Sequence, residues 1–151
     1  MPLSDVINEM PMVEYFSDQE KKMFAEMKHS FVGFKNGATI INEGDESTSM
    51  FLLIKGTCLI TKTQDNTTIR LAKIKAGELF GEMSFFTRNP RHTNVIASDD
   101  VMVMKMDDDF FKKMNPDVRD KIKNYFIELL IKRLNAMNAS IMRTSKLMHA
   151  R

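Results

Sequence analysis

The sequence predicts a mainly β fold with flanking helices, an α+β arrangement centred on a jelly-roll β-barrel. Between residues 31 and 106, about eight short apolar stretches alternate with turn signals at the spacing typical of such barrels. Residues 1–30 instead show helical spacing, and residues 107–151 include a long stretch without Gly or Pro. We therefore divide the chain into an N-terminal helical segment (1–30), a β-roll (31–106) and C-terminal helices (107–151).

The N-terminal segment is expected to form two helices. Apolar residues recur mostly at three- and four-residue spacing from Leu3 to about Lys28, and Pro11 divides the pattern. Ser17 and Glu20 have the spacing of a capping box, which predicts where the second helix starts. We expect these helices to pack on the segment that follows.

In the central segment, short apolar runs are separated by turn residues. Asn36-Gly37 predicts a tight turn, and Cys58 is expected to be a small apolar strand residue that shares a face with Ile60. Residues Glu43-Gly44-Asp45 are expected to form another turn. The expected strands are residues 31–34, 39–41, 50–54, 57–63, 68–74, a short one at Leu79, 93–97 and 101–106.

After the β-roll, two helices are expected. Three aspartates, residues 107–109, open a short helix over residues 110–114, with acidic groups at its positive end. Asn115 followed by Pro116 is typical of an N-cap and a first helical position. The sequence therefore predicts a short helix, a hinge near Asn115 and a long C-terminal helix.

Composition and size favour a soluble globular protein. The chain has 151 residues, 43% apolar and 28% charged, which suits one domain with an extension. A single cysteine and an N-terminus unlike a signal peptide favour a cytoplasmic setting. The longest apolar run, residues 50–54, is too short to span a membrane. A net charge of +2 gives no electrostatic case for nucleic-acid binding.

The histidines argue against an enzyme of the similar cupin jelly-roll type, because such metal sites need clustered His and carboxylate ligands. His29, His92 and His149 lie far apart in sequence, and no Ser-His-Asp or Walker-type pattern is present. We therefore expect no catalytic residue, no metal and no cofactor. His29 and His149 are expected on the surface.

One stretch, residues 80–97, has the features of an anion site. Gly81 follows an apolar pair and a short helix can open at Glu82, where first-turn N–H groups lack partners and favour a phosphate. Pro90 ends the intervening loop, and Arg91 then lies beside this helix, where its guanidinium can bind a phosphate in a bidentate way. Since a carboxylate beside a phosphate repels it, Glu82 needs another partner, such as sugar hydroxyls.

This stretch resembles the phosphate-binding cassette of cyclic nucleotide-binding domains, the family of the catabolite activator protein and kinase regulatory subunits. The matching residues are Phe80, Gly81, Glu82, Met83, Ser84, Phe85, Pro90, Arg91, Thr93, Val95 and Ala97. The resemblance implies that Arg91 binds the exocyclic phosphate oxygens and Glu82 the ribose 2′-hydroxyl. Backbone amides near Met83 and Ser84 would complete the site.

The position after Arg91 departs from the family pattern. His92 stands where the family usually has Thr, Ser or Ala, and it can donate to the phosphate, point away or crowd the base. Cyclic AMP is the expected ligand by frequency, with cyclic GMP and cyclic dinucleotides as alternatives. Donors and acceptors for the base are expected from Asn135 and Asn138. The candidate ligand-binding residues are Phe80, Gly81, Glu82, Met83, Ser84, Arg91, His92, Thr93, Asn135 and Asn138.

The long helix has an apolar seven-residue repeat with one polar interruption, which is typical of a two-helix seam. Its positions are Ile127, Leu130, Leu134, Met137, Ile141, Thr144 and Met148. We expect a parallel homodimer through this helix; the alternative is that the face packs on its own barrel. The activator branch of the family dimerises in this way.

Together these features predict a cyclic-nucleotide sensor that signals by movement of its C-terminal helix. The output is expected to pass to a downstream protein partner or to the protein's own assembly. A helix-turn-helix domain would need about 60 further residues, so no DNA-binding domain of its own is expected. Neither a DNA partner nor a membrane is expected. The alternative is a ligand-free dimerisation module of the same fold, in which Arg91 pairs with Glu82 or another acid.

Overall fold

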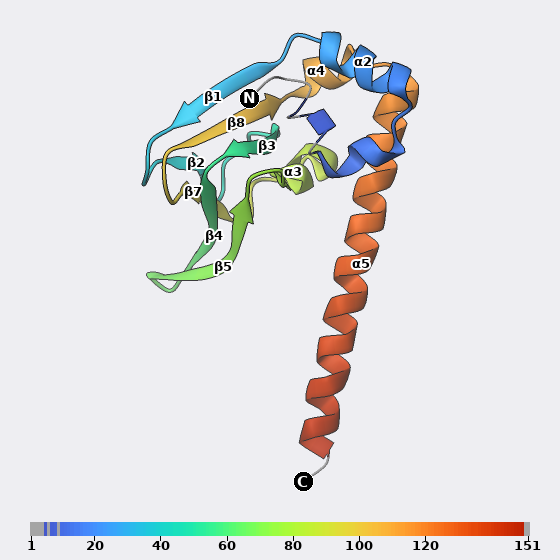
Figure 1. Cartoon of the computed structure of the whole chain (residues 1–151). Coiled ribbons are helices and arrows are strands. Elements are labelled where there is room, and N and C mark those ends of the chain that lie inside the picture. Colours follow the sequence, from blue (N-terminus) through green and yellow to red (C-terminus); the bar gives the residue numbers. More distant parts are fainter. Residues whose placement is uncertain (1–4, 6, 9, 150–151) are drawn as a thin grey trace. The chain divides into compact units, whose positions relative to one another are not determined.

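The computed structural model describes residues 5, 7, 8 and 10–149, with side chains up to residue 146. Contacts within the chain divide it into two units, Met1–Met114 and Asn115–Arg151. The first unit contains the strands and the short helices, and the second is a single long helix (Figure 1). Antiparallel sheets, flanking helices and a long C-terminal helix confirm the predicted fold class.

Two short helices precede the strands. A 3₁₀ helix, η1 (Pro11–Tyr15), begins at Pro11, where the sequence pattern predicted a break, and α2 (Asp18–Glu26) follows. The capping box is present: Ser17 Oγ accepts from the Glu20 amide at 3.1 Å, and Glu20 Oε1 accepts from the Ser17 amide at 2.8 Å. The first predicted helix falls partly on residues 1–4, 6 and 9, which lie outside the described residues.

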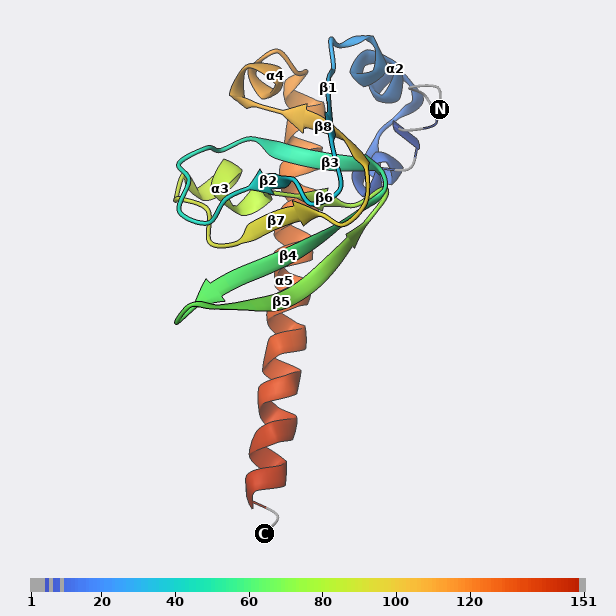
Figure 2. The ribbon, with the colours of Figure 1, turned by 90° about the vertical axis from the view of Figure 1, so that its left-hand side faces the viewer.

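Eight described strands form two antiparallel sheets of four (Figures 1 and 2). The first sheet has the order β1-β8-β3-β6, with β1 (Ser30–Phe34), β8 (Val101–Met106), β3 (Met50–Lys55) and β6 (Leu79–Phe80). The second has the order β2-β7-β4-β5, with β2 (Thr39–Ile41), β7 (Asn94–Ala97), β4 (Thr57–Gln64) and β5 (Thr67–Lys75). All eight predicted strands are therefore confirmed, and none of their ends is shifted by more than one residue.

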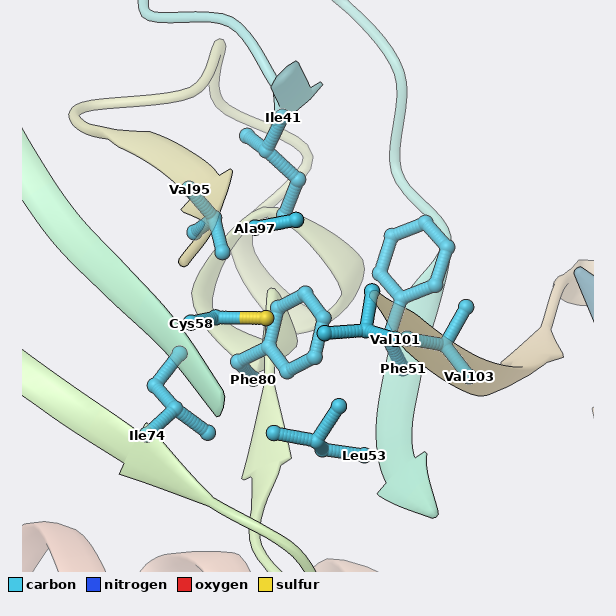
Figure 3. Close-up of a cluster of buried hydrophobic side chains, with 10 residues drawn as sticks. All are labelled: Ile41, Phe51, Leu53, Cys58, Ile74, Phe80, Val95, Ala97, Val101 and Val103. Atoms are coloured by element: carbon cyan, nitrogen blue, oxygen red, sulfur yellow. The ribbon is translucent and has the colours of Figure 1, made fainter. Parts of the chain in front are cut away.

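The core lies where inward-facing side chains of both sheets meet (Figure 3). Phe51 and Phe80 stack with ring centroids 5.2 Å apart, and Cys58 from the second sheet lies in the same cluster, fully buried. Burial, with a smaller effect from the Asp99 carboxylate, raises the pKa of the Cys58 thiol to about 11. The thiol therefore stays protonated and packs as a small apolar group, as predicted.

The turn at Asn36-Gly37 is present, but it does not close a β-hairpin. The strands on either side of it pair in different sheets, β1 with β8 and β2 with β7. The Gly37 amide donates to Ala97 O at 2.8 Å, on β7, rather than across the turn. This turn therefore passes the chain from one sheet to the other.

The prediction that His29 is a surface residue was wrong. Its ring is half-buried among aromatic rings, with centroids 5.2 Å from Phe24 and 5.4 Å from Phe110. His29 Nε2 lies 2.9 Å from the Phe24 carbonyl oxygen, and burial lowers the pKa of the imidazole. Aromatic residues from α2, β1 and α4, far apart in sequence, bury this histidine. His149 lies outside the residues whose side chains are described.

The helix α4 (Asp108–Lys112) begins two residues earlier than predicted. The Asp107 carboxylate accepts a hydrogen bond from the Phe110 amide at 2.9 Å, so Asp107 is the N-cap and the two following acids belong to the helix. Phe110 and Phe111 are buried on this helix.

The second unit is the helix α5 (Pro116–His149), whose 34 residues correspond to about 51 Å. Asn115 Oδ1 accepts from the Asp117 amide at 2.9 Å, which confirms the predicted N-cap with Pro116 in the first helical position. None of the described helices is both long enough and apolar enough to cross a membrane.

We predict that Gly56→Ala destabilises the protein by about 2–6 kcal/mol, through a strained backbone and a steric clash. Gly56 has φ +92°, and a Cβ there would lie 2.6 Å from Asp100 O and 2.7 Å from Val101 Cγ1. Gly37→Ala is the matched control, because Gly37 has φ +88° but open space around it. Urea unfolding of both variants measures the difference; equal losses would contradict the steric argument.

Candidate functional site

The candidate site begins where β6 ends and α3 (Glu82–Thr87) starts. Between them, Gly81 has φ +79°, and a Cβ there would lie 3.1 Å from Arg91 Nη1 and 3.1 Å from Ser49 O. Both the backbone conformation and the close approach of Arg91 require glycine. The first-turn amides of α3 follow directly and provide donors without intrahelical partners.

Arg91 is the centre of the site. Its side chain is only 5% exposed. Nη1 donates to Gly81 O at 2.8 Å, Nη2 donates to Ser49 O at 2.5 Å, and Nε donates to Ser47 Oγ at 3.3 Å. The guanidinium is therefore held in one orientation by acceptors from two segments far apart in sequence.

The backbone of Arg91 is held by the same loop. The Arg91 amide donates to Asp45 O at 2.8 Å, and Arg91 O accepts from the Gly44 amide at 2.8 Å. The predicted turn at Gly44-Asp45 is present and positions this arginine.

The electrostatics of Arg91 combine opposing effects. Burial lowers the pKa of the guanidinium from its usual value, and the carboxylates of Asp45 and Glu82 oppose that shift. A guanidinium has five N–H donors. Three have the acceptors given above, and one on each terminal nitrogen has no acceptor among the described residues. These two donors suit two oxygens of a phosphate.

The other cassette residues differ in exposure. Glu82, at the first position of α3, is 6% exposed, and Ser84 is also buried. Met83 between them is exposed. Phe80 lies in the hydrophobic cluster, so its side chain packs in the core beneath the site. Glu82, Ser84 and Arg91 are thus all buried, and Arg91 contacts Gly81, the residue directly before α3.

The side chain of His92 is exposed, and Thr93 is half-buried. The carbonyl oxygen of His92 accepts a hydrogen bond from Lys62 Nζ at 3.1 Å. Asn135 and Asn138 are exposed on α5, in the second unit, and their role toward a base stays a prediction.

Sequence reasoning missed Ser47, Ser49 and Lys62. These residues contact Arg91 or His92 across 30 to 44 positions of the sequence. A run of hydroxyl residues, 47–49, was visible, but nothing in it indicated a contact with an arginine in the segment between α3 and β7. Only the pairing of the sheets brings these segments together.

A second contact joins the end of α3 to α4. Arg88, the C-cap of α3 with φ +63°, binds Asp108 in a bidentate way, with N···O distances of 2.6 and 2.8 Å. Beside it, the rings of Phe85 and Phe111 lie 4.4 Å apart. The helix that starts at the candidate site is thus fixed to the helix that precedes the hinge.

Among the described residues, no group of three or more His, Cys, Asp or Glu side chains is arranged to hold a metal ion. The site combines one buried cation, whose donors meet two backbone carbonyls and a hydroxyl, with the first-turn amide donors of α3 and one buried carboxylate.

Comparison with known proteins identifies the family of this chain. A family model described as a cyclic nucleotide-binding domain matches residues 31–115, more than half of the chain. The cAMP-dependent protein kinase type II regulatory subunit of Drosophila melanogaster is 28% identical over 98 residues. That match covers 65% of this chain but only 26% of the relative, so the chain spans about a quarter of that protein.

Solved structures share the fold. The catabolite activator protein of Thermus thermophilus superposes with a TM-score of 0.78. The two share 20% identity, over 89% of this chain and 63% of that one. The regulatory subunit of a cAMP-independent protein kinase A from Trypanosoma brucei has a TM-score of 0.68 and 20% identity, over 80% of this chain and 44% of that one. At this identity, both likenesses concern the fold alone.

We predict that the pair of Arg88 and Asp108 contributes a pH-dependent part of the stability. Its hydrogen bonds to Arg88 lower the pKa of Asp108. A lowered carboxyl pKa stabilises the folded state above the unfolded-state value of about 3.9. The contribution disappears as the pH falls through the lower folded-state value. The difference in unfolding free energy between the wild type and Asp108→Asn should therefore be constant near neutral pH and vanish in acid.

The control is Asp109→Asn, which removes the next acid of the same helical turn and reports the effect of the helix dipole alone. In an Arg88→Gln background, Asp108→Asn should lose its additional effect. Equal pH profiles for the two Asn variants would contradict a specific contribution of the pair.

Proposed function

The chain belongs to the cyclic nucleotide-binding domain family, and on this premise we propose that it binds a cyclic nucleotide, with cAMP the first candidate, at the cassette around Arg91. The proposal rests chiefly on the buried guanidinium of Arg91. It is oriented by Gly81, Ser47 and Ser49, and it keeps one N–H on each terminal nitrogen for a phosphate. Such preorganised donors lose little freedom when the ligand binds.

The residues around Arg91 fit the remaining parts of the ligand. The first-turn amides of α3, near Met83 and Ser84, would donate to the phosphate together with Arg91. Glu82 would accept from the ribose 2′-hydroxyl, which explains a carboxylate at this place. His92 and Thr93 would lie beside the phosphate or base, with Asn135 and Asn138 as candidate base contacts from α5.

Cyclic AMP is favoured because the names of the kinase regulatory relatives specify it. Cyclic GMP stays a candidate because His92 replaces the small residue usual in the family. The fold alone does not decide the ligand, because a protein of the same fold, from Trypanosoma brucei, is described as the regulatory subunit of a cAMP-independent kinase. We propose a regulatory role rather than a catalytic one.

The second candidate is a ligand-free dimerisation module, in which Arg91 pairs with Glu82 or another acid. The acceptors of Arg91 among the described residues are two carbonyls and a hydroxyl rather than a carboxylate. None of these hydrogen bonds ties the guanidinium to an acid, although the carboxylates of Asp45 and Glu82 act on its pKa. We favour the sensor hypothesis for this reason.

We further propose that the signal leaves through α5. In this account, a bound nucleotide alters the hinge near Asn115, and α5 pairs with the same helix of a second copy and presents a surface to a downstream protein. The seam residues Ile127, Leu134, Met137 and Ile141 are exposed by 54–62% in the isolated chain, and Leu130 is half-exposed. Thr144, the polar interruption, bonds its hydroxyl to Ser140 O at 3.0 Å on its own helix. Met148 lies outside the described side chains.

We predict that Arg91→Ala abolishes nucleotide binding. Removing one partner of a desolvated charge pair costs about 2–5 kcal/mol, or roughly 30-fold to several thousandfold in affinity. Calorimetric titration of ligand-stripped protein with cAMP and with cGMP measures the loss. Because Arg91 also binds the protein's own carbonyls, Arg91→Lys should be titrated too, with urea unfolding to confirm that each variant folds.

Arg70→Ala is the control for this experiment, because Arg70 is an exposed arginine on β5 outside the cassette. It should leave binding unchanged. Folded wild-type protein that gives no heat with either nucleotide would contradict the sensor hypothesis and leave the dimerisation module.

We predict that Leu134→Glu weakens a homodimer by about 3 kcal/mol or more, because each subunit would bury an unpaired charge in the seam. Sedimentation velocity over a concentration series measures the change. Ala136→Glu introduces the same side chain away from the seam and should leave the dimer intact. A wild type that stays monomeric, or equal effects of the two variants, would exclude this seam.

A further inference from the structure

Lys62 has a position that the proposed function does not use. On β4, Cys58 pairs with Ala97 and Ile60 pairs with Val95, and these residues face or pack against the core. Side chains alternate along a strand, so Lys62, two residues after Ile60, lies on the same face of β4. Lys62 itself is half-buried, and Thr61 between the two is buried at 4% exposed. Lysine is rarely placed on such a face without a specific partner.

The sheet register also places Lys62 beside the candidate site. β4 and β7 pair as far as Thr61 and Asn94, and one further step brings Lys62 opposite Thr93. Its ammonium reaches the backbone of the preceding residue, with Nζ 3.1 Å from His92 O. Lys62 thus adjoins two positions of the cassette directly after Arg91.

The charge of Lys62 is available to a ligand. An ammonium has three donors, and the carbonyl of His92 accepts from one of them. Among the described residues, no carboxylate forms an ion pair with Lys62. On β5 the residue opposite Lys62 is Ile69, which is 41% exposed, so the surroundings leave room on this side.

The groups of a cyclic nucleotide differ in what they offer this ammonium. In the proposed function, Arg91 and the α3 amides bind the phosphate, and Glu82 binds the ribose, which leaves the base. Guanine presents two adjacent acceptors, O6 and N7, and lysine is a common partner for them. Adenine presents one acceptor beside an amino donor, which a lysine cannot accept from.

We propose that Lys62 contacts the base edge of the bound nucleotide and favours a 6-oxopurine, so that the site binds cGMP in addition to cAMP. This inference rests on the proposed function. Lys62 is thereby a specificity-determining residue, and the site has a donor for guanine in a part of the sequence remote from the cassette.

The test compares three nucleotides, cAMP, cGMP and cIMP, by calorimetry on wild-type protein and on Lys62→Met, which keeps the length and removes the charge. Inosine has the 6-oxo group but no 2-amino group, so it isolates the proposed contact. We expect Lys62→Met to lose about five- to tenfold in affinity for both cGMP and cIMP, with cAMP binding unchanged. The matched control is Lys73→Met. Lys73 is an exposed lysine on β5, opposite the outward-facing Leu59, and this variant should alter none of the three affinities.

Several outcomes would overturn the inference. An equal loss for all three nucleotides would show that Lys62 acts through the phosphate or the His92 backbone. A loss for cGMP but not for cIMP would show that the 2-amino group is being sensed. Unchanged affinities for all three nucleotides in folded Lys62→Met would remove Lys62 from the site while leaving the proposed function intact. By contrast, no binding of any nucleotide to the wild type would overturn the proposed function itself.

Discussion

The buried guanidinium of Arg91 is the constraint on which the site depends. A cation removed from water is costly unless its donors find acceptors, and here two carbonyls and a hydroxyl provide them. These acceptors come from Gly81 and from the loop that contains Ser47 and Ser49. The loop and the turn before α3 must therefore keep their places for Arg91 to stay buried.

This requirement explains local features that otherwise look unrelated. Gly81 needs a positive φ, and it has no Cβ, which would crowd both Arg91 and Ser49. The turn at Gly44-Asp45 exchanges two backbone hydrogen bonds with Arg91, so it is tied to the start of β7. Beneath the site, the stack of Phe51 on Phe80 fixes β3 against β6, the strand that ends at Gly81. The hydrophobic core and the candidate site thus both depend on the end of β6.

The site is also joined to the helices that follow it. Exposed ion pairs contribute little on average, but a bidentate pair of Arg and carboxylate adds geometric specificity. Arg88 and Asp108 form such a pair next to the buried contact of Phe85 with Phe111. Because α3 provides the proposed phosphate donors and α4 precedes the hinge, a shift of α3 would be transmitted to α4 through these two contacts. This gives the proposed sensor a physical route within the first unit.

The sequence by itself determined the strands, the capped helix at Ser17, the long helix after Pro116 and the cassette, because each depends on neighbours in the chain. Alternation, capping and turn chemistry act over a few residues, so they can be recognised without the fold. Only the tertiary structure decided that Asn36-Gly37 joins two sheets, that His29 is enclosed by aromatic rings, and that Ser47, Ser49 and Lys62 reach the cassette. These outcomes depend on which strands pair, and strand pairing joins residues 30 to 60 positions apart whose local sequence contains no sign of one another.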